Sequence, residues 1–127
     1  MKKKLFISCP MKGRTVENIK KSIDKMHKIA EILFEQKLEV IPSICGAIGK
    51  YGILKLSESI EALSEADYFI GVRYTDMYPN CNVESDVARS YGIPVVYAEM
   101  EYVMPDVLEI EREHWENTTD DYCVKPL

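Results

Sequence analysis

Residues 68–72 read YFIGV, an unbroken apolar run in the middle of the chain. A run of this length without polar alternation is typical of a strand buried on both faces, as in a parallel sheet. Three further short strands are predicted at residues 4–9 (KLFISC), 38–41 (LEVI) and 94–98 (PVVYA). The sequence therefore predicts four strands, with residues 68–72 in a central place.

Helical patterns fill the intervals between these strands. Thr15 can cap a helix that runs to about residue 36 and carries one apolar stripe. Two further helices are predicted at 54–66 and 82–91, and Gly92 is placed to cap the last one. Regular alternation of strands and helices implies right-handed crossovers and a parallel sheet. We predict an α/β fold: a Rossmann-like (flavodoxin-like) parallel sheet of four to five strands flanked by helices, in a single domain.

The composition narrows the classes of function. The chain has 127 residues, of which 46% are hydrophobic and 29% charged, and its net charge is −5. An acidic balance argues against a surface that binds a nucleic acid polymer. The apolar run after the lysines at 2–4 is too short for a signal peptide or a membrane span. We therefore expect no membrane partner and a cytoplasmic protein, in the host cytoplasm if a phage encodes it.

The last 29 residues lack the strand–helix rhythm. We divide the chain into an α/β domain at 1–98 and an acidic C-terminal extension at 99–127. The extension is expected to form one short helix and to pack on the domain or on an oligomer partner.

The four cysteines are far apart in the sequence. They lie at Cys9, Cys45, Cys81 and Cys123, without a CxxC pair or zinc spacing. We interpret all four as thiols in a reducing compartment, and we expect neither a metal nor an organic cofactor.

Ligands of open parallel sheets bind beyond the carboxyl ends of the strands. The segments at 8–14, 42–52 and 73–84 are predicted to converge there. They contain neither GxGxxG nor a Walker loop, which excludes the common dinucleotide and P-loop sites. Tyr74 and Tyr78 could stack on a base, although loop aromatics often only pack against the protein.

Glu84 is the strongest candidate for a catalytic residue. It is expected in the first turn of the third helix, where the helix dipole favours an ionised carboxylate. Such a carboxylate can attack an electrophilic sugar carbon, as in retaining glycosyl transfer. A capping or dipole role is the alternative. Asp76 could bind a ribose hydroxyl or protonate a leaving group, and Asp67 is either a second such acid or a boundary residue bonded to local backbone.

Three stretches resemble nucleoside 2-deoxyribosyltransferase-like proteins, a group of small phage and bacterial proteins. They are LFISCPMKGRT at 5–15, SESIEALSEADYFIGV at 57–72 and NCNVESDVARSYGIPVVYA at 80–98. The resemblance implies that Glu84 is a nucleophile, with Ala88 and Gly92-Ile93-Pro94 matching the family pattern. It also implies that the loop after the first strand lines a nucleoside pocket.

Together these observations predict a nucleoside- or nucleotide-binding protein that cleaves or transfers an N-glycosidic bond, with Glu84 as nucleophile and Asp76 or Asp67 as the assisting acid. The alternative is a non-catalytic phage-type sponge that sequesters a nucleotide-derived immune signal, cyclic or ADP-ribose-like. The tract ahead of Glu84 lacks the glycine usual in the enzymes, which favours this alternative. The expected ligand-binding residues are Ser8, Cys9, Pro10, Met11, Gly13, Arg14, Tyr74, Tyr78 and Asn82.

We also expect a homo-oligomer, a dimer or tetramer. The family completes its pockets with a neighbouring subunit, and several apolar side chains exceed what this core needs. The alternative is that the acidic extension covers them. These residues are Tyr51, Ile53, Leu54, Tyr74, Met77, Tyr78, Tyr102, Val103 and Met104.

Overall fold

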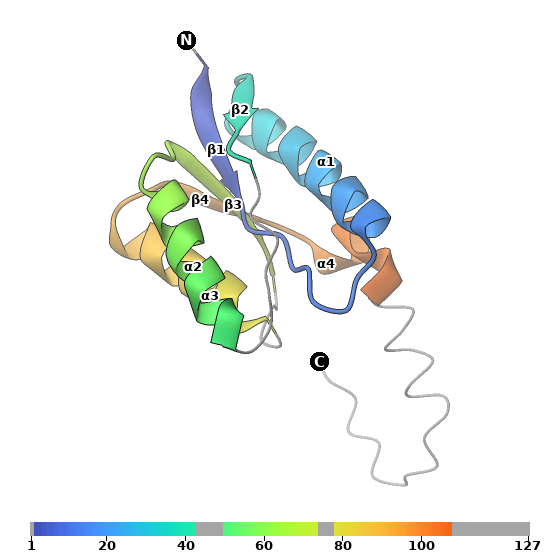
Figure 1. The fold of residues 1–127 in the computed structure, drawn as a ribbon. Helices are drawn as coiled ribbons and strands as arrows, with labels where there is room; N and C mark the ends of the chain where they lie inside the picture. Colours follow the sequence, from blue (N-terminus) through green and yellow to red (C-terminus); the bar gives the residue numbers. More distant parts are fainter. Residues whose placement is uncertain (1, 43–49, 74–77, 108–127) are drawn as a thin grey trace, which may run out of the picture.

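A four-stranded, all-parallel sheet forms the centre of the protein (Figure 1). The structure, a computed structural model, describes residues 2–42, 50–73 and 78–107. In spatial order the strands are β2 (Leu38–Val40), β1 (Lys3–Ile7), β3 (Tyr68–Val72) and β4 (Val95–Ala98). The predicted α/β fold is confirmed, and β3 lies inside the sheet as expected. The chain moves outward from β1 to β2, then returns to β3 and continues to β4 on the other side. The strand order therefore reverses between β1 and β3.

Helices cover both faces of the sheet. Helix α1 (Val16–Leu33) and the short α4 (Met100–Val103) lie on one face, and α2 (Lys50–Leu63) and α3 (Pro79–Ser90) lie on the other (Figure 1). Alternation along the strands separates two buried clusters. Leu5 and Ile70 belong to the cluster that contains Met26 of α1. The neighbouring Phe6 and Phe69 stack on each other in a second cluster with Leu63 of α2.

Two predicted helix caps are present. The Thr15 side chain accepts a hydrogen bond from the Asn18 amide at 3.1 Å at the start of α1. Gly92, with φ of +78°, follows the end of α3, and its amide bonds to the Arg89 carbonyl. This φ lies in the left-handed region, where glycine ends helices without strain.

The start of α3 differs from the prediction. The helix begins at Pro79 instead of residue 82, because proline with its fixed φ suits a first helical position. Glu84 consequently lies in the second turn, and no acidic residue occupies the first turn. The expected placement of Glu84 beside the helix N-terminus is therefore wrong.

The described part of the C-terminal extension packs on the α/β domain. Ser22 of α1 donates a hydrogen bond to the Val103 carbonyl, and Lys25 donates one to the Tyr102 carbonyl. Three side chains expected in an exposed patch are instead buried: Tyr78, Val103 and Met104. Of the described members, Tyr102 is exposed. The oligomer stays a prediction, and most of its apolar basis now falls on side chains that the structure does not describe.

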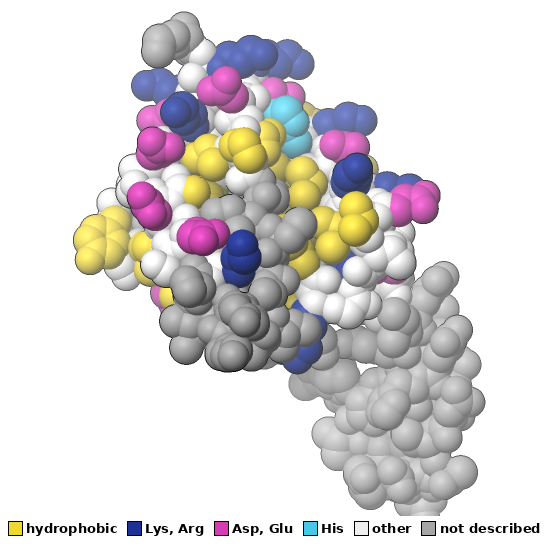
Figure 2. Space-filling view, in the orientation of Figure 1, with side chains coloured by type: hydrophobic (Ala, Val, Ile, Leu, Met, Phe, Trp, Pro, Cys, Tyr) yellow, Lys and Arg dark blue, Asp and Glu magenta, His cyan; other side chains and the backbone are white. Residues whose placement is uncertain are grey.

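Positive and negative side chains are interspersed on the face shown in Figure 2, over the part that is described. This mixture agrees with the net charge of −5 and gives no broad basic stripe on this face. Among the described residues, the helices are too short or too polar to cross a bilayer.

Candidate functional site

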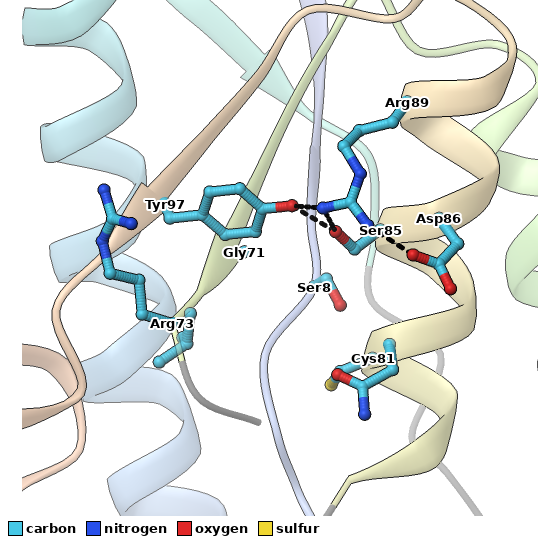
Figure 3. Close-up of a pocket in the computed structure, with 10 residues that line it drawn as sticks. Ser8, Gly71, Arg73, Cys81, Ser85, Asp86, Arg89 and Tyr97 are labelled. Carbon is cyan, nitrogen blue, oxygen red and sulfur yellow. Dashed lines mark hydrogen bonds and ion pairs between the residues drawn. The ribbon is translucent and has the colours of Figure 1, made fainter. Parts of the chain in front are cut away.

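A pocket of about 490 Å³ opens at the carboxyl ends of β1 and β3, where the strand order reverses. This is the position at which open α/β sheets bind ligands, and the volume suits a small organic molecule. Ser8 lies at its floor, directly after β1, and Arg73 directly follows β3 (Figure 3). The remaining lining residues are Gly71, Val72, Cys81, Asn82, Ser85, Asp86, Arg89 and Tyr97.

Glu84 is buried beside this pocket and is joined to it through Ser8. The Ser8 hydroxyl donates a hydrogen bond to Glu84 Oε1 at 2.7 Å, although the two residues are 76 positions apart. Glu84 is 7% exposed, and among the described residues it is the one charged residue that is buried together with its backbone. It is not itself among the lining residues of the pocket. The carboxyl therefore lies one hydrogen bond behind the pocket surface.

Burial raises the pKa of the Glu84 carboxyl above its ordinary value, and hydrogen bonds from Ser8 and Ser59 partly oppose this. Desolvation disfavours the charged form, whereas donors to the carboxylate favour it. The sequence argument relied on the helix dipole to keep Glu84 ionised. The structure replaces the dipole with two serine hydroxyls, since Glu84 lies beyond the first turn.

Two buried free thiols accompany Glu84. Burial raises the pKa of Cys9 to about 11 despite the opposing charge of Arg14, and it raises the pKa of Cys81 to about 12. Both thiols are protonated at neutral pH, so neither is an activated nucleophile. Among the thiols and carboxyls described here, Glu84 is the stronger candidate for chemistry.

Arg14 does not face the pocket. Its side chain is 1% exposed and forms a two-point ion pair with Asp106, at 2.9 and 3.0 Å. The guanidinium also donates to the Pro10 carbonyl and to Ser22 Oγ, at 2.8 and 2.6 Å. All three of its nitrogens thus have acceptors within the protein. The expected role of Arg14 in ligand binding has no support in this placement, since its donors are already used.

Asp67 lies at the opposite end of the sheet from the pocket. Its carboxylate accepts a hydrogen bond from the Lys4 amide at 2.8 Å, and its own amide bonds to the Lys4 carbonyl. It immediately precedes β3 and lies four residues before Gly71, the first residue of that strand to line the pocket, a span of about 13 Å. Asp67 therefore makes the contacts of the boundary residue in the structural alternative, and its catalytic role stays a prediction that this placement does not support.

The other predicted residues divide into four groups. Ser8 and Asn82 line the pocket. Cys9, Pro10 and Tyr78 are buried in the protein, so Tyr78 does not present an open face for stacking. Met11 and Gly13 belong to the turn before α1, where the Met11 carbonyl accepts the Arg14 amide and Gly13 has a φ of +74°. Tyr74 and Asp76 fall outside the described residues.

Sequence reasoning missed a polar face of α3. Asn82, Ser85, Asp86 and Arg89 follow the spacing i, i+3, i+4, i+7, which places side chains on one face of a helix. The helix predicted at 82–91 contains all four positions, so this spacing could have identified the face.

A tyrosine from β4 completes the pocket. The structure suggests that the Tyr97 ring lies over Gly71 of β3, because a Cβ added at Gly71 would come within 3.4 Å of Tyr97 Cε1. The Tyr97 hydroxyl bonds to Ser85 and accepts from Arg89 (Figure 3). Gly71 is thus the residue that leaves room for the ring.

Comparison of the chain with models of protein families, with curated proteins and with solved structures gives no match.

Proposed function

We propose that the protein binds a nucleoside or nucleotide in this pocket and cleaves or transfers its N-glycosidic bond, with Glu84 as the reacting carboxyl. The observation that carries the proposal is the hydrogen bond between buried Glu84 and the pocket-lining Ser8. A buried carboxyl with a shifted pKa at a strand-end cleft is a frequent mark of an active site. The resemblance of the sequence to nucleoside 2-deoxyribosyltransferase-like proteins supports the same role for Glu84.

The chemistry requires a carboxylate, a sugar carbon and a proton for the leaving base. Ionised Glu84 would attack C1′ of the sugar, forming a glycosyl ester as the bond from C1′ to the base nitrogen breaks. Water or a second base would then release the sugar. Donors on Ser8 and Ser59 support the ionised form that this attack needs. The base would take its proton from an acid at the pocket, a role for which Asp76 was predicted.

The test is incubation with a panel of nucleosides and nucleotides, followed by chromatography of the free and protein-bound fractions. The wild-type protein should release free base, and Glu84→Gln should not. Glu61→Gln is the matched control, because Glu61 is an exposed residue of α2. Near-normal base release by Glu84→Gln would remove Glu84 from the reaction.

A second candidate is a protein that sequesters its ligand without turnover. It is favoured by the position of Glu84, which is 7% exposed and lies behind Ser8. A nucleophile needs direct access to its target, whereas a binder does not. Recovery of unchanged ligand only after the wild-type protein is denatured would support this candidate and overturn the enzyme.

A further inference from the structure

We infer that the rim of the pocket formed by Arg89, Ser85 and Tyr97, with Arg73 opposite, is a subsite for a phosphate monoester group of the ligand. The inference deepens the proposed function and rests on it for the rest of the ligand. It names the part of the ligand that the rim recognises.

Charge is the first observation. Among the described residues, three charged side chains line the pocket, and two of them are arginines: Arg73 and Arg89. The protein as a whole has a net charge of −5, so two arginines at one pocket run against its overall charge. A positive lining in an acidic protein favours an anionic ligand at that place.

Tyr97 holds the two arginines on either side of itself. Arg89 Nη1 donates to the Tyr97 hydroxyl and to Ser85 Oγ, the latter at 3.2 Å. The guanidinium carbon of Arg73 lies 5.8 Å from the centre of the Tyr97 ring. Figure 3 shows the ring between the two side chains, with the dashed contacts at its hydroxyl end. Two hydroxyls and a guanidinium therefore meet at one point of the rim, as phosphate oxygens require.

The present partners of the two arginines can be exchanged. Arg89 pairs with Asp86, and the two side chains are 54% and 69% exposed. Arg73 pairs with Glu99 at 2.9 Å, with exposures of 51% and 65%. Exposed pairs of this kind contribute little to stability, so a phosphate with more charge and more acceptor oxygens can replace the carboxylate. The rim is thus occupied by weak internal partners that an incoming anion displaces.

The contacts of each residue determine whether its variant should raise or lower the affinity for phosphate. Arg89→Ala removes the main donor, and Tyr97→Phe removes one hydroxyl while leaving the ring over Gly71. Asp86→Asn removes the competing carboxylate of Arg89. Lys20→Ala is the matched control, because it also removes one exposed positive charge but lies on α1, across the sheet from α3.

The experiment is calorimetric titration with inorganic phosphate, with the common nucleoside 5′-monophosphates and with the corresponding nucleosides. The wild-type protein should bind at least one monophosphate about tenfold or more tightly than its nucleoside. Arg89→Ala should abolish this difference, by lowering the affinity for the monophosphate much more than the affinity for the nucleoside. Tyr97→Phe should reduce the difference, Asp86→Asn should increase phosphate affinity, and Lys20→Ala should change neither value.

Equal affinity of the wild-type protein for monophosphates and nucleosides would overturn the subsite. So would an equal loss of both affinities in Arg89→Ala, or weaker phosphate binding in Asp86→Asn. Failure of the proposed chemistry has a separate signature. If inorganic phosphate binds in an Arg89-dependent way and no base is released, the subsite is supported and the proposed enzyme activity is overturned. If base is released without any preference for monophosphates, the activity is supported and the subsite is overturned.

Discussion

Two arginine–aspartate pairs in this protein share their chemistry and differ in their surroundings. In the Arg14–Asp106 pair the side chains are 1% and 19% exposed, and further acceptors surround the guanidinium. In the Arg89–Asp86 pair they are 54% and 69% exposed, at the rim of a pocket. The first pair fastens residues after β4 to the loop after β1. The second lies within one turn of α3 and can be exchanged for a ligand. Burial, and not residue type, separates a structural arginine from a binding one.

The largest expected effect is on the buried pair. Arg14→Ala should lower the free energy of unfolding by about 3–5 kcal/mol, because Asp106 would be left without its partner in a partly buried place. Urea unfolding at neutral pH measures the change. Arg14→Lys is the comparison variant, since it keeps the charge and loses the two-point geometry, and its loss should be intermediate. A loss below about 1 kcal/mol for Arg14→Ala would show that the pair is not structural.

The next effect concerns Glu84 and pH. Burial raises the pKa of Glu84 in the folded protein, so the folded state holds this proton more tightly than the unfolded state. The protonated Glu84 carboxyl therefore contributes its full stabilisation below the ordinary pKa of glutamate. This stabilisation is lost as pH rises through the raised pKa of Glu84 in the folded protein. Glu84→Gln should be more stable than the wild-type protein at pH 7, by on the order of 1 kcal/mol, and its advantage should shrink as pH falls. Unfolding curves from about pH 2 to pH 8 test this.

Asp106 should make stability depend on pH in the opposite direction, and the same experiment measures this. Desolvation alone would raise the pKa of Asp106, but the hydrogen bond and charge of Arg14 together hold it below its ordinary value. Its contribution is present above the ordinary pKa of aspartate and is lost as pH falls through the folded value. Asp106→Asn should therefore be less stable than the wild-type protein at pH 7, with a deficit that shrinks in acid. If both variants respond to pH with the same sign, one of the two assignments is incorrect.

A smaller effect on stability is expected at Gly71, where a new side chain would disturb the packing at the pocket. In Gly71→Ala the new methyl would meet Phe69 Cε1 at 3.2 Å and Tyr97 Cε1 at 3.4 Å, so the Tyr97 ring has to move. We expect a stability loss of about 1 kcal/mol together with a several-fold loss of phosphate affinity. Gly92→Ala is the control, because it has a φ of +78° and open space around it. It should lose similar stability and keep its phosphate affinity, and an equal loss of affinity in both variants would contradict the role of Gly71.

The smallest effect is expected for the exposed pair. Arg89→Ala should change the free energy of unfolding by no more than about 0.5 kcal/mol, since exposed i,i+3 pairs contribute little. The same urea titration that is used for Arg14→Ala measures it. A loss above about 2 kcal/mol would make Arg89 a structural residue like Arg14 and would remove the contrast between the two pairs.

The sequence was sufficient for the fold and insufficient for the site. The apolar run at 68–72 and the alternation of strands with helices predicted the parallel sheet, because burial on both faces leaves a pattern that can be read locally. The start of α3 was misplaced because Pro79 can end a loop as readily as begin a helix. That error put Glu84 next to the helix dipole. The polar face at 82, 85, 86 and 89 lies within the predicted helix, but only the tertiary structure shows that this face borders a pocket.

The roles of the two arginines could not be predicted from sequence. Arg14 follows a glycine near a strand end, the position typical of a ligand-binding loop, and nothing local shows that Asp106 will reach it. Arg89 lies in the last turn of a helix, where a positive charge has an ordinary role beside the helix C-terminus. Tertiary contacts decide both cases: Asp106 covers the first arginine, and Tyr97 of β4 draws the second toward the pocket.

The Arg14–Asp106 contact has a consequence for the order of folding, because 92 positions separate its partners. A ribosome that adds about 5–20 residues per second needs roughly 5–18 seconds to make the chain between them. During that interval the Arg14 guanidinium is hydrated or bonded to acceptors other than Asp106. The loop after β1 thus acquires its final set of contacts only after all four strands of the sheet have been synthesised.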